Sequence, residues 1–317
     1  MKKAMKHRVL MLGGPTASGK TALSLIAAER LGGEIINADS MQVYRGLDIL
    51  SAQPDAHEKA QAPHHLFSVL EPSERCSVGR WAEMALACMD EVRGRGRVPI
   101  LVGGTGLYFK ALLEGLALIP QISEHIQDKV SALAKSGGID ALEAEAERLD
   151  PVGTARLEGA DRQRLMRIVA VGYETGQALS ELQKETRPLV DRDEVLGIAI
   201  QPERATLYAR IETRFDLMTD MGALDEAQAI ADRNLAPDLP AMKAVGLPPL
   251  LRHLTGELEL EEALDIAKRD TRRYAKRQFT WFSNQHPDWA RIEALDPSDQ
   301  AAQLNAILDG ERSETAG

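Results

Sequence analysis

Cysteine is scarce in the 317-residue chain, which has only two, at positions 76 and 88. Their spacing matches neither a zinc site nor a disulfide framework. Cys88 falls on an apolar helical stripe with Trp81, Met84 and Val92. We therefore expect a core thiol, and a protein that works in a reducing, cytoplasmic compartment.

Long apolar runs are also missing from the sequence. No stretch approaches the ~18 apolar residues that a membrane-spanning helix needs. The apolar run VLML at 9–12 is too short for a signal peptide and leads directly into a glycine-rich segment. We therefore expect no association with a membrane.

Positive charge is in deficit, since the formal net charge is −10. This balance argues against indiscriminate nucleic-acid binding over the whole surface. Residues 268–277, KRDTRRYAKR, are the exception, because they carry six Lys or Arg and a single Asp. Two interpretations stay open: a basic helical face that grips a polyanion in one place, or a helix flank paired with acidic neighbours.

A phosphate-binding loop is the strongest local motif. Residues 13–24 read GGPTASGKTALS and follow the apolar run. The spacing Gly-x-x-x-x-Gly-Lys-Thr in a strand–turn–helix context presents backbone N–H groups, an ammonium and a hydroxyl to phosphate and to magnesium. We expect phosphate binding by the whole loop and a Mg2+ ligand at its end. The loop residues are Gly14, Pro15, Thr16, Ala17, Ser18, Gly19, Lys20 and Thr21, and Thr21 is the expected metal ligand.

Short apolar runs alternate with helical patterns along the chain. EIINADS at 34–40, PILVGGT at 99–105 and VLGIAI at 195–200 read as buried strands, which predicts a parallel sheet covered on both faces. The predicted fold class is α/β: a P-loop NTPase-like parallel sheet flanked by helices, with a helical insertion domain. We expect the core at 1–118 and 195–305, the insertion at 119–194, and a disordered tail at 306–317. Ligands should collect beyond the carboxyl ends of the strands.

Loops of this kind usually bind GTP or ATP, and the rest of the sequence argues against some of these uses. The Asn-Lys-x-Asp signature of GTP binding is missing, and no predicted strand ends in the paired acids of a motor ATPase. Asp39 follows a strand, so a small-molecule kinase that uses ATP is the alternative function. The turn at 103–108 offers the Thr105 hydroxyl to a charged oxygen, or is only a structural turn. The pair His64-His65 lacks further ligands at metal spacing and is interpreted as structural.

Seven motifs in order resemble those of the bacterial tRNA dimethylallyltransferases, also called isopentenyl-tRNA transferases. They are GPTASGKT at 14–21, DSMQVYRG at 39–46, PHHL at 63–66, VGGTGLY at 102–108, DRQRLMR at 161–167, the segment 210–214 and YAKRQFTWF at 274–282. The resemblance covers nearly the whole chain. It implies that the loop holds the diphosphate of dimethylallyl diphosphate, and that the prenyl group passes to N6 of the adenosine 3′-adjacent to the anticodon.

The resemblance also implies roles for individual residues. Asp39 would accept the N6 proton, and Thr105, Lys20, Arg214 and Mg2+ would stabilise charge on the leaving diphosphate. The partners would be dimethylallyl diphosphate and a tRNA anticodon stem-loop with its adenine extruded, and we expect a monomer. The expected tRNA contacts are Asp39, Ser40, Met41, Gln42 and Thr105 at the base, Gln163, Arg164, Leu165, Met166 and Arg167 in the insertion, and Arg273 and Lys276 in the basic helix.

The chain departs from the family pattern in two places. Ile168-Val169-Ala170 stands where Ala-Leu-Glu is usual, and Leu247 with two prolines stands where a Val-Gly-Tyr turn ends. These departures put in question a glutamate after Arg167 and an aromatic RNA contact after Gly246.

Overall fold

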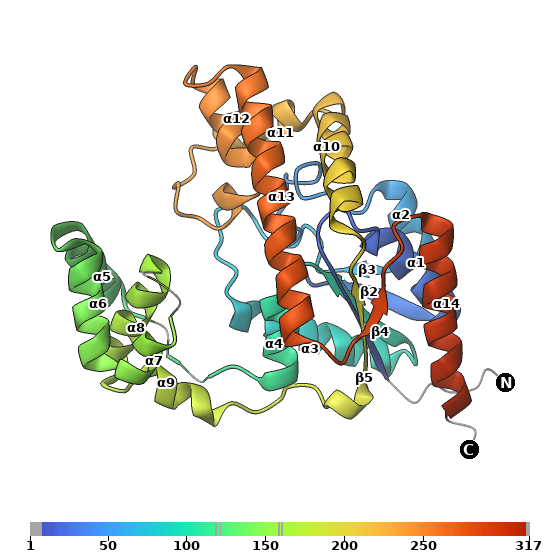
Figure 1. The fold of residues 1–317 in the computed structure, drawn as a ribbon, viewed down its shortest axis with the longest axis horizontal. Coiled ribbons are helices and arrows are strands. Elements are labelled where there is room, and N and C mark those ends of the chain that lie inside the picture. The colour runs from blue at the N-terminus through green and yellow to red at the C-terminus, as the bar shows by residue number, and fades with distance from the viewer. Residues whose placement is uncertain (1–7, 118, 121, 158, 160, 315–317) are drawn as a thin grey trace. The chain divides into compact units, whose positions relative to one another are not determined.

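The computed structural model describes residues 8–314 except 118, 121, 158 and 160. Its centre is one six-stranded sheet in the order β3-β2-β4-β1-β5-β6, and all neighbouring strands are parallel (Figure 1). The strands are β1 (Val9–Gly13), β2 (Gly33–Asn37), β3 (His64–His65), β4 (Val98–Gly103), β5 (Val195–Ile200) and β6 (Ala290–Ile292). The predicted parallel sheet is confirmed. The two shortest strands, at its edges, were not expected from the sequence.

The strand register brings the carboxyl ends of the central strands together. Gly13 pairs with Gly103, and Asn37 pairs with Val102. Every residue of β1 and β2 is buried, as expected for strands covered on both faces. The turns that follow β1, β2 and β4 therefore leave the sheet at the same edge.

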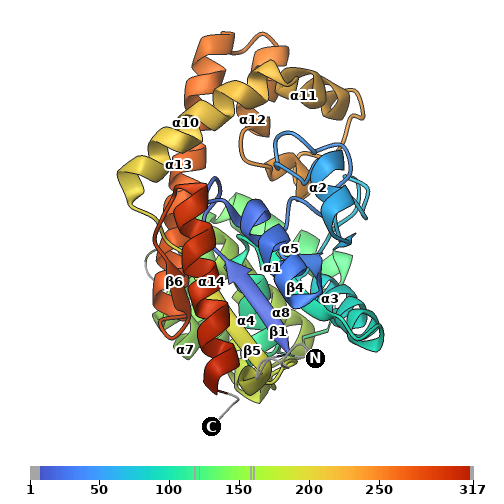
Figure 2. The ribbon, with the colours of Figure 1, turned by 90° about the vertical axis from the view of Figure 1, so that its right-hand side faces the viewer.

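Helices α1 (Lys20–Leu31) and α14 (Pro297–Glu314) cover one face of the sheet and lie side by side (Figure 2). Leu23 and Ala27 of α1 pack with Leu304 and Leu308 of α14 over Leu10 and its neighbours. The expectation of a disordered tail from 306 is wrong for 306–314, which continue α14. The sequence around Asp309 is polar, but the helix still has an apolar stripe, because Leu304 and Leu308 are one turn apart and fully buried. Residues 315–317 lie outside the described residues.

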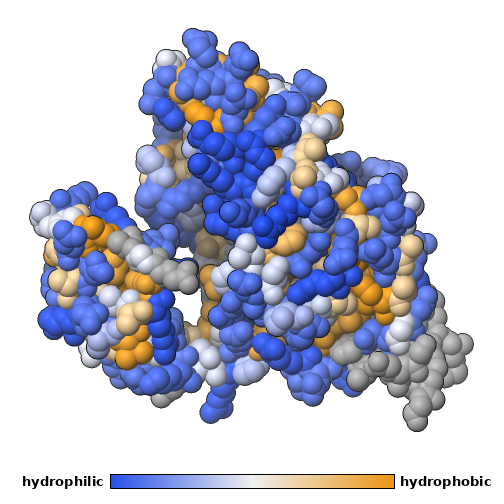
Figure 3. All heavy atoms as spheres, in the orientation of Figure 1, coloured by the Kyte–Doolittle hydropathy of each residue, from blue (hydrophilic) through white to orange (hydrophobic). Residues whose placement is uncertain are grey.

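The other helices of the larger unit are α2 (Ala56–Gln61), α3 (Val78–Gly94), α4 (Gly106–Glu114), α10 (Arg204–Asp220), α11 (Ala223–Ala231), α12 (Leu247–Leu254) and α13 (Leu260–Gln285), with the short 3-10 turns η2 (Arg192–Glu194) and η3 (Ala241–Lys243). Helix α13 packs against both α10 and α12, and hydrophilic side chains gather along it (Figure 3). We call α10, α11 and α12 the helical lobe. No helix among the described residues is long and apolar enough to cross a membrane.

A second compact unit comprises Glu114–Leu189, while the larger unit comprises Met1–Leu113 and Val190–Gly317. The smaller unit contains α5 (Glu124–Ser136), α6 (Gly138–Leu149), α7 (Pro151–Ala155), α8 (Arg162–Thr175), α9 (Leu179–Leu182) and η1 (Gln183–Glu185). Leu142, Ala146 and Val169 are fully buried in a core of its own. Its boundaries lie five residues before those expected for the insertion, because α4 ends near Glu114 and the segment after Val190 already belongs to the larger unit.

Candidate active site

The phosphate loop connects β1 to α1 in the predicted place. Gly19 precedes the helix with φ 94°, a left-handed conformation that glycine adopts without strain. Because α1 begins at Lys20, the N–H groups of its first turn have no acceptor within the helix, and its dipole favours an anion there. The loop is therefore built to receive phosphate groups.

Lys20 lies against its own loop. Its Nζ donates hydrogen bonds to Gly14 O at 3.0 Å and Pro15 O at 2.6 Å. Desolvation lowers the pKa of Lys20 to about 8, opposed by the negative charge of Asp39 and reinforced by the positive charge of Arg214. The ammonium is therefore poised to exchange loop carbonyls for an anionic ligand.

Asp39 leaves the end of β2 in a turn fixed by Asn37. Asn37 Oδ1 accepts the Asp39 N–H at 2.8 Å, and Asn37 Nδ2 donates to Asp39 O at 2.9 Å. Asp39 Oδ1 in turn accepts the Met41 N–H at 2.9 Å. No helix begins within the following residues 40–55, all of which are described, so Asp39 is not a helix cap.

Thr105 ties the end of β4 to the segment after Asp39. Its Oγ1 accepts the Ser40 N–H at 2.9 Å and donates to Ser40 Oγ at 3.2 Å, while the Thr105 N–H donates to Ala38 O at 3.2 Å. In this arrangement the Thr105 proton is directed at Ser40. To donate to a ligand, the hydroxyl must rotate away from Ser40 Oγ.

One pocket brings the phosphate loop and the turn of Asp39 together, whereas Lys20, Thr21 and Thr105 are not among its lining residues. Asp39 and Thr16 line it with Arg214, whose Nη1 donates to Thr16 Oγ1 at 3.5 Å. Burial lowers the pKa of Arg214, and the neighbouring Arg210 charge lowers it further. The full lining is Thr16, Ala17, Asp39, Met41, Leu50, Ser51, Ile211, Arg214, Phe215, Met218, Ala244, Val245, Thr271 and Tyr274. The pocket thus combines a charged end with an apolar wall.

Tyr274 of α13 also lines this pocket, although from the sequence it was expected only as part of the motif at 274–282. Burial raises the pKa of the Tyr274 hydroxyl, and the negative charge of Asp39 raises it further. Tyr274 therefore stays protonated beside the carboxylate at any physiological pH.

The apolar wall is held by the helical lobe. Glu226 of α11 accepts the N–H groups of Ile49 at 2.8 Å and Leu50 at 2.9 Å through its two carboxylate oxygens. Burial raises the pKa of Glu226. This carboxylate fixes the turn that carries Leu50 against the lobe that carries Phe215.

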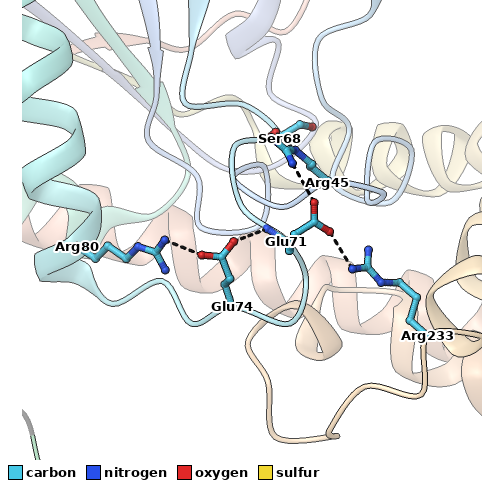
Figure 4. Close-up of polar contacts among 6 residues, drawn as sticks. All are labelled: Arg45, Ser68, Glu71, Glu74, Arg80 and Arg233. Carbon is cyan, nitrogen blue, oxygen red and sulfur yellow. Dashed lines mark hydrogen bonds and ion pairs between the residues drawn. The ribbon is translucent and has the colours of Figure 1, made fainter.

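A surface network of charged residues adds a second tie to the lobe (Figure 4). Glu71 accepts from Arg45 at 2.9 Å and from Arg233, beyond the end of α11, at 2.8 Å. The Glu71 N–H donates to Glu74, whose carboxylate also pairs with Arg80 at 2.7 Å. Hydrogen bonds from Arg233 and Arg45 lower the pKa of Glu71, and the bond from Arg233 has the larger effect. Such exposed pairs orient segments more than they stabilise them.

Met41 and Gln42, which were also expected to contact the adenine base, lie in different places. Met41 lines the pocket, but Gln42 Nε2 donates to Ser51 O at 3.0 Å and Ala52 O at 2.9 Å. The Gln42 amide therefore shapes the turn beneath the pocket. Its assignment to tRNA contact stays a prediction.

The residues expected to bind tRNA in the insertion lie on α8. Gln163, Arg164 and Arg167 are exposed, and Met166 is half-buried. Leu165 is only 1% exposed inside the core of the smaller unit, so its side chain is not available to RNA and that expectation is wrong. The helical periodicity puts Leu165 on the opposite face from Arg167.

The two departures from the family pattern both serve packing. Ile168, Val169 and Ala170 are buried in the core of the smaller unit, and Leu247 is fully buried at the start of α12. The side chain of Leu247 therefore packs inside the larger unit and is not available for an RNA contact.

The basic segment of α13 divides between the two interpretations. Lys268 pairs with Asp216 at 2.5 Å, and Arg272 pairs with Glu212 at 2.6 Å, both on α10. Arg273 and Lys276 are exposed. One flank of the segment therefore joins α13 to α10, and the other faces solvent.

The structural interpretations of the histidines and of Cys88 fit the geometry. His65 Nε2 lies 2.7 Å from Glu34 Oε2, and His64 Nδ1 lies 2.8 Å from Ala62 O. Cys88 is buried in α3. Over the described part of the chain, no cluster of three or more His, Cys, Asp or Glu side chains is suited to a metal ion.

Two buried amides that the sequence did not single out hold the phosphate loop. Gln278 of α13 accepts the Thr16 N–H at 2.8 Å, and Gln300 of α14 donates to Ser18 O at 2.7 Å. A Cβ at Gly19 would overlap the Gln300 side chain. Gln278 belongs to the motif at 274–282 and Gln300 to none, and no local pattern predicts the contact of either with the distant loop.

Comparison with known proteins agrees with this geometry. A sequence model of the family described as IPP transferase matches residues 42–285. A tRNA dimethylallyltransferase of Maricaulis maris is 58% identical over 300 residues, 95% of this chain and 97% of that protein. A tRNA dimethylallyltransferase of Caulobacter sp. is 48% identical over 290 residues, 92% of this chain and 94% of that protein.

Solved structures are similar over nearly the whole chain. The full-length tRNA isopentenylpyrophosphate transferase of Bacillus halodurans is 33% identical, with a TM-score of 0.69 over 98% of this chain and 100% of that chain. A eukaryotic dimethylallyltransferase solved acting on tRNA is 27% identical, with a TM-score of 0.81 over 95% of this chain and 78% of that chain. The chain therefore belongs to the IPP transferase family, the family of the tRNA dimethylallyltransferases.

Proposed function

We propose that this enzyme transfers the dimethylallyl group of dimethylallyl diphosphate to N6 of the adenosine 3′-adjacent to the anticodon of certain tRNAs. The observation that carries the proposal is that the phosphate loop and Asp39 line one pocket whose remaining residues are mostly apolar, among them Leu50, Ile211 and Phe215. A diphosphate, a short hydrocarbon and a weakly acidic amino group need these three surroundings together.

The diphosphate end of the donor would lie on the loop at 14–21. Its oxygens would accept from the N–H groups of the first turn of α1, and the Lys20 ammonium would move to them from Gly14 O and Pro15 O. Arg214 lies beside Thr16 at the same end of the pocket. As the allylic C–O bond breaks, negative charge grows on the diphosphate, and these cations stabilise it.

The acceptor end would lie at Asp39. The adenine amino group becomes strongly acidic only as the new N–C bond forms, so a carboxylate of ordinary basicity suffices to take its proton. Asp39 Oδ1 is held by the Met41 N–H, which fixes the carboxylate toward the pocket that Met41 also lines. Thr105, held against Ser40, would donate to a leaving-group oxygen once its hydroxyl rotates.

A magnesium ion fits the donor set at the loop. Thr21 offers a half-exposed hydroxyl in the first turn of α1. Magnesium is commonly held by one or two protein oxygens together with phosphate oxygens and water. Thr21 would hold the ion, which when bound would neutralise part of the charge on the diphosphate.

The tRNA would contact exposed basic residues on two helices. Arg273 and Lys276 on α13, and Gln163, Arg164 and Arg167 on α8, present side chains to solvent. Phosphate contacts of this kind supply affinity and orientation without reading sequence.

The test is the identity of the donor. Purified protein should bind dimethylallyl diphosphate in the presence of magnesium, and unmodified tRNA should gain the mass of one dimethylallyl group on the adenosine beside the anticodon. A small-molecule kinase would instead bind ATP tightly and transfer its phosphate to a small substrate. ATP turnover with no prenylated nucleoside in the RNA digest would overturn the proposed function.

A further inference from the structure

Helix α13 fills the space between the turns that follow β1 and β4. Three glycines in or bordering these turns lack room for a side chain because residues of α13 occupy the place of each Cβ. The pairs are Gly13 with Phe282, Gly104 with Gln278, and Gly106 with Trp281. These glycines are therefore required by the packing of α13, and the backbone there is closed on that side.

Gln278 makes the polar contact in this packing. Its Oε1 accepts the Thr16 N–H at 2.8 Å, and its Nε2 donates to Gly104 O at 3.0 Å. The residue is only 5% exposed, so both ends of the amide are paired in a water-poor environment. One side chain thus bridges the phosphate loop and the turn of Thr105.

We propose that Gln278 is a positioning residue for the prenyl transfer, an inference that rests on the function proposed above. Thr16 lines the pocket beside Arg214, and Thr105 directly follows Gly104. By fixing Thr16 and Gly104 on one amide, Gln278 holds the diphosphate site and the Thr105 hydroxyl at a constant separation. That separation decides whether the leaving oxygen and its donors stay aligned.

The role is distinct from that of the exposed side of α13. Tyr274, Gln278 and Phe282 recur every four residues and face the turns, whereas Arg273 and Lys276 face solvent. A change at Gln278 therefore alters the arrangement of the two turns and leaves the basic surface intact. This separation predicts an effect on turnover without an effect on tRNA affinity.

The first experiment compares Gln278→Met with Gln201→Met. Methionine is close to glutamine in size but removes both hydrogen bonds. Gln201 Nε2 donates to Phe279 O at 3.1 Å and Ser283 Oγ at 2.8 Å, so the control loosens the same helix without touching either turn. Turnover per folded molecule should fall about 10²-fold in Gln278→Met, because a displacement of about 1 Å has that cost.

The control should keep turnover within a few-fold of the original protein, and both variants should keep the original KM for tRNA. Circular dichroism and melting temperature give the folded fraction of each. Equal turnover for the two variants, or loss confined to tRNA affinity, would overturn the positioning role. A lack of prenyl transfer by the unmodified protein would instead contradict the proposed function.

A second experiment does not depend on the stability of Gln278→Met. Gly104→Ala should displace the Gln278 amide and lower turnover by a similar factor, since the new methyl group would overlap Nε2. In a Gln278→Ala background the overlap with the amide is gone, and the nearest remaining atom is Gly14 O at 3.2 Å, a tight contact that a shift of a few tenths of an ångström relieves. The same Gly104→Ala change should then cost little further turnover. Fully additive losses in this double-mutant cycle would contradict the proposal.

Discussion

At the scale of single residues, the site depends on side chains held by backbone groups of neighbouring turns. Asp39 accepts the Met41 N–H, and Lys20 donates to Gly14 O and Pro15 O. Each functional group thus has a protein partner in place of the substrate. Binding exchanges these partners, so little reorganisation is needed at the moment of reaction.

Asp39→Asn tests the proton acceptor. The Asn Oδ1 can still accept the Met41 N–H, so the turn should be preserved while the negative charge is lost. We expect turnover to fall ~10²-fold or more, with affinity for dimethylallyl diphosphate nearly unchanged. Asp48→Asn, an exposed acid farther along the same segment, is the matched control. Turnover of Asp39→Asn within a few-fold of that control would remove Asp39 from the base role.

The pH dependence of donor binding tests Lys20. Its pKa of about 8 in the free protein means that the ammonium is lost as the pH rises through that value. The dissociation constant for dimethylallyl diphosphate should therefore be flat from about pH 7 to 8 and rise toward tenfold per unit above it. Calorimetric titrations with magnesium over this range measure the trend. In Lys20→Arg, whose guanidinium stays charged, the rise should disappear; a rise of equal size would assign it to another group.

The sequence predicted the residues that carry a chemical pattern and missed those that act only by contact. Sequence motifs are easiest to recognise at strand ends, and this is where the loop at 14–21, Asp39 and Thr105 lie. Gln278 and Gln300 lie 262 and 282 positions from the loop groups that they bind, and although Gln278 belongs to the motif at 274–282, nothing in the local sequence predicts either contact. The sequence left open whether the turn at 103–108 contacts a ligand or is structural, and in the structure Gln278 and Trp281 fill the space beside Gly104 and Gly106.

At the scale of elements, the faces of helix α13 make different contacts. Its buried face contacts the turns of the site, one flank pairs with α10 through Lys268 and Arg272, and Arg273 and Lys276 are exposed. The sequence indicated a basic helix but left open whether it bound a polyanion or its own acidic neighbours. The partners come from α10, far away in the sequence, so composition alone did not separate them.

Salt dependence distinguishes the two flanks of α13. Arg273→Ala should weaken tRNA binding and reduce the magnitude of the slope of log K against log salt by about 0.7 to 0.9, the value for one lost phosphate contact. Arg272→Ala should instead lower the melting temperature slightly, since an exposed ion pair such as that with Glu212 contributes at most about 1 kcal/mol. Filter binding over a salt series, with thermal melts, gives both quantities.

Both variants should bind dimethylallyl diphosphate normally, because the loop is untouched. An unchanged slope in Arg273→Ala and also in Lys276→Ala would place the RNA away from this helix.

The elements that the sequence did not predict have a related origin. Strand β6 has only three residues, and the end of α14 reads as polar after Leu308. Short or weakly patterned elements form because a neighbouring surface is ready to cover them.

At the scale of the whole molecule, the chain is divided so that one unit contains the site and the other interrupts it. The Val190 N–H donates to Leu112 O at 3.0 Å, so the chain leaves and re-enters the larger unit at neighbouring positions. The smaller unit buries Leu142 and Val169 in its own core. The sequence predicted this insertion from the loss of strand patterns but placed its limits five residues late, although Gly115, with φ 84°, marks the end of α4.

Replacement of residues 114–189 by a short Gly-Ser linker tests the division of labour. Because the ends of the insertion lie beside each other, the larger unit should fold, and its affinity for dimethylallyl diphosphate should match that of the full chain. Its affinity for tRNA should fall by at least about tenfold at physiological salt, since the contacts expected from Arg164 and Arg167 are lost. The matched control is the full chain with both arginines changed to alanine, which should lose tRNA affinity with its fold complete. If both proteins keep the tRNA affinity of the full chain, RNA binding rests on the larger unit alone. If only the double alanine variant keeps it, the RNA contacts other residues of the insertion.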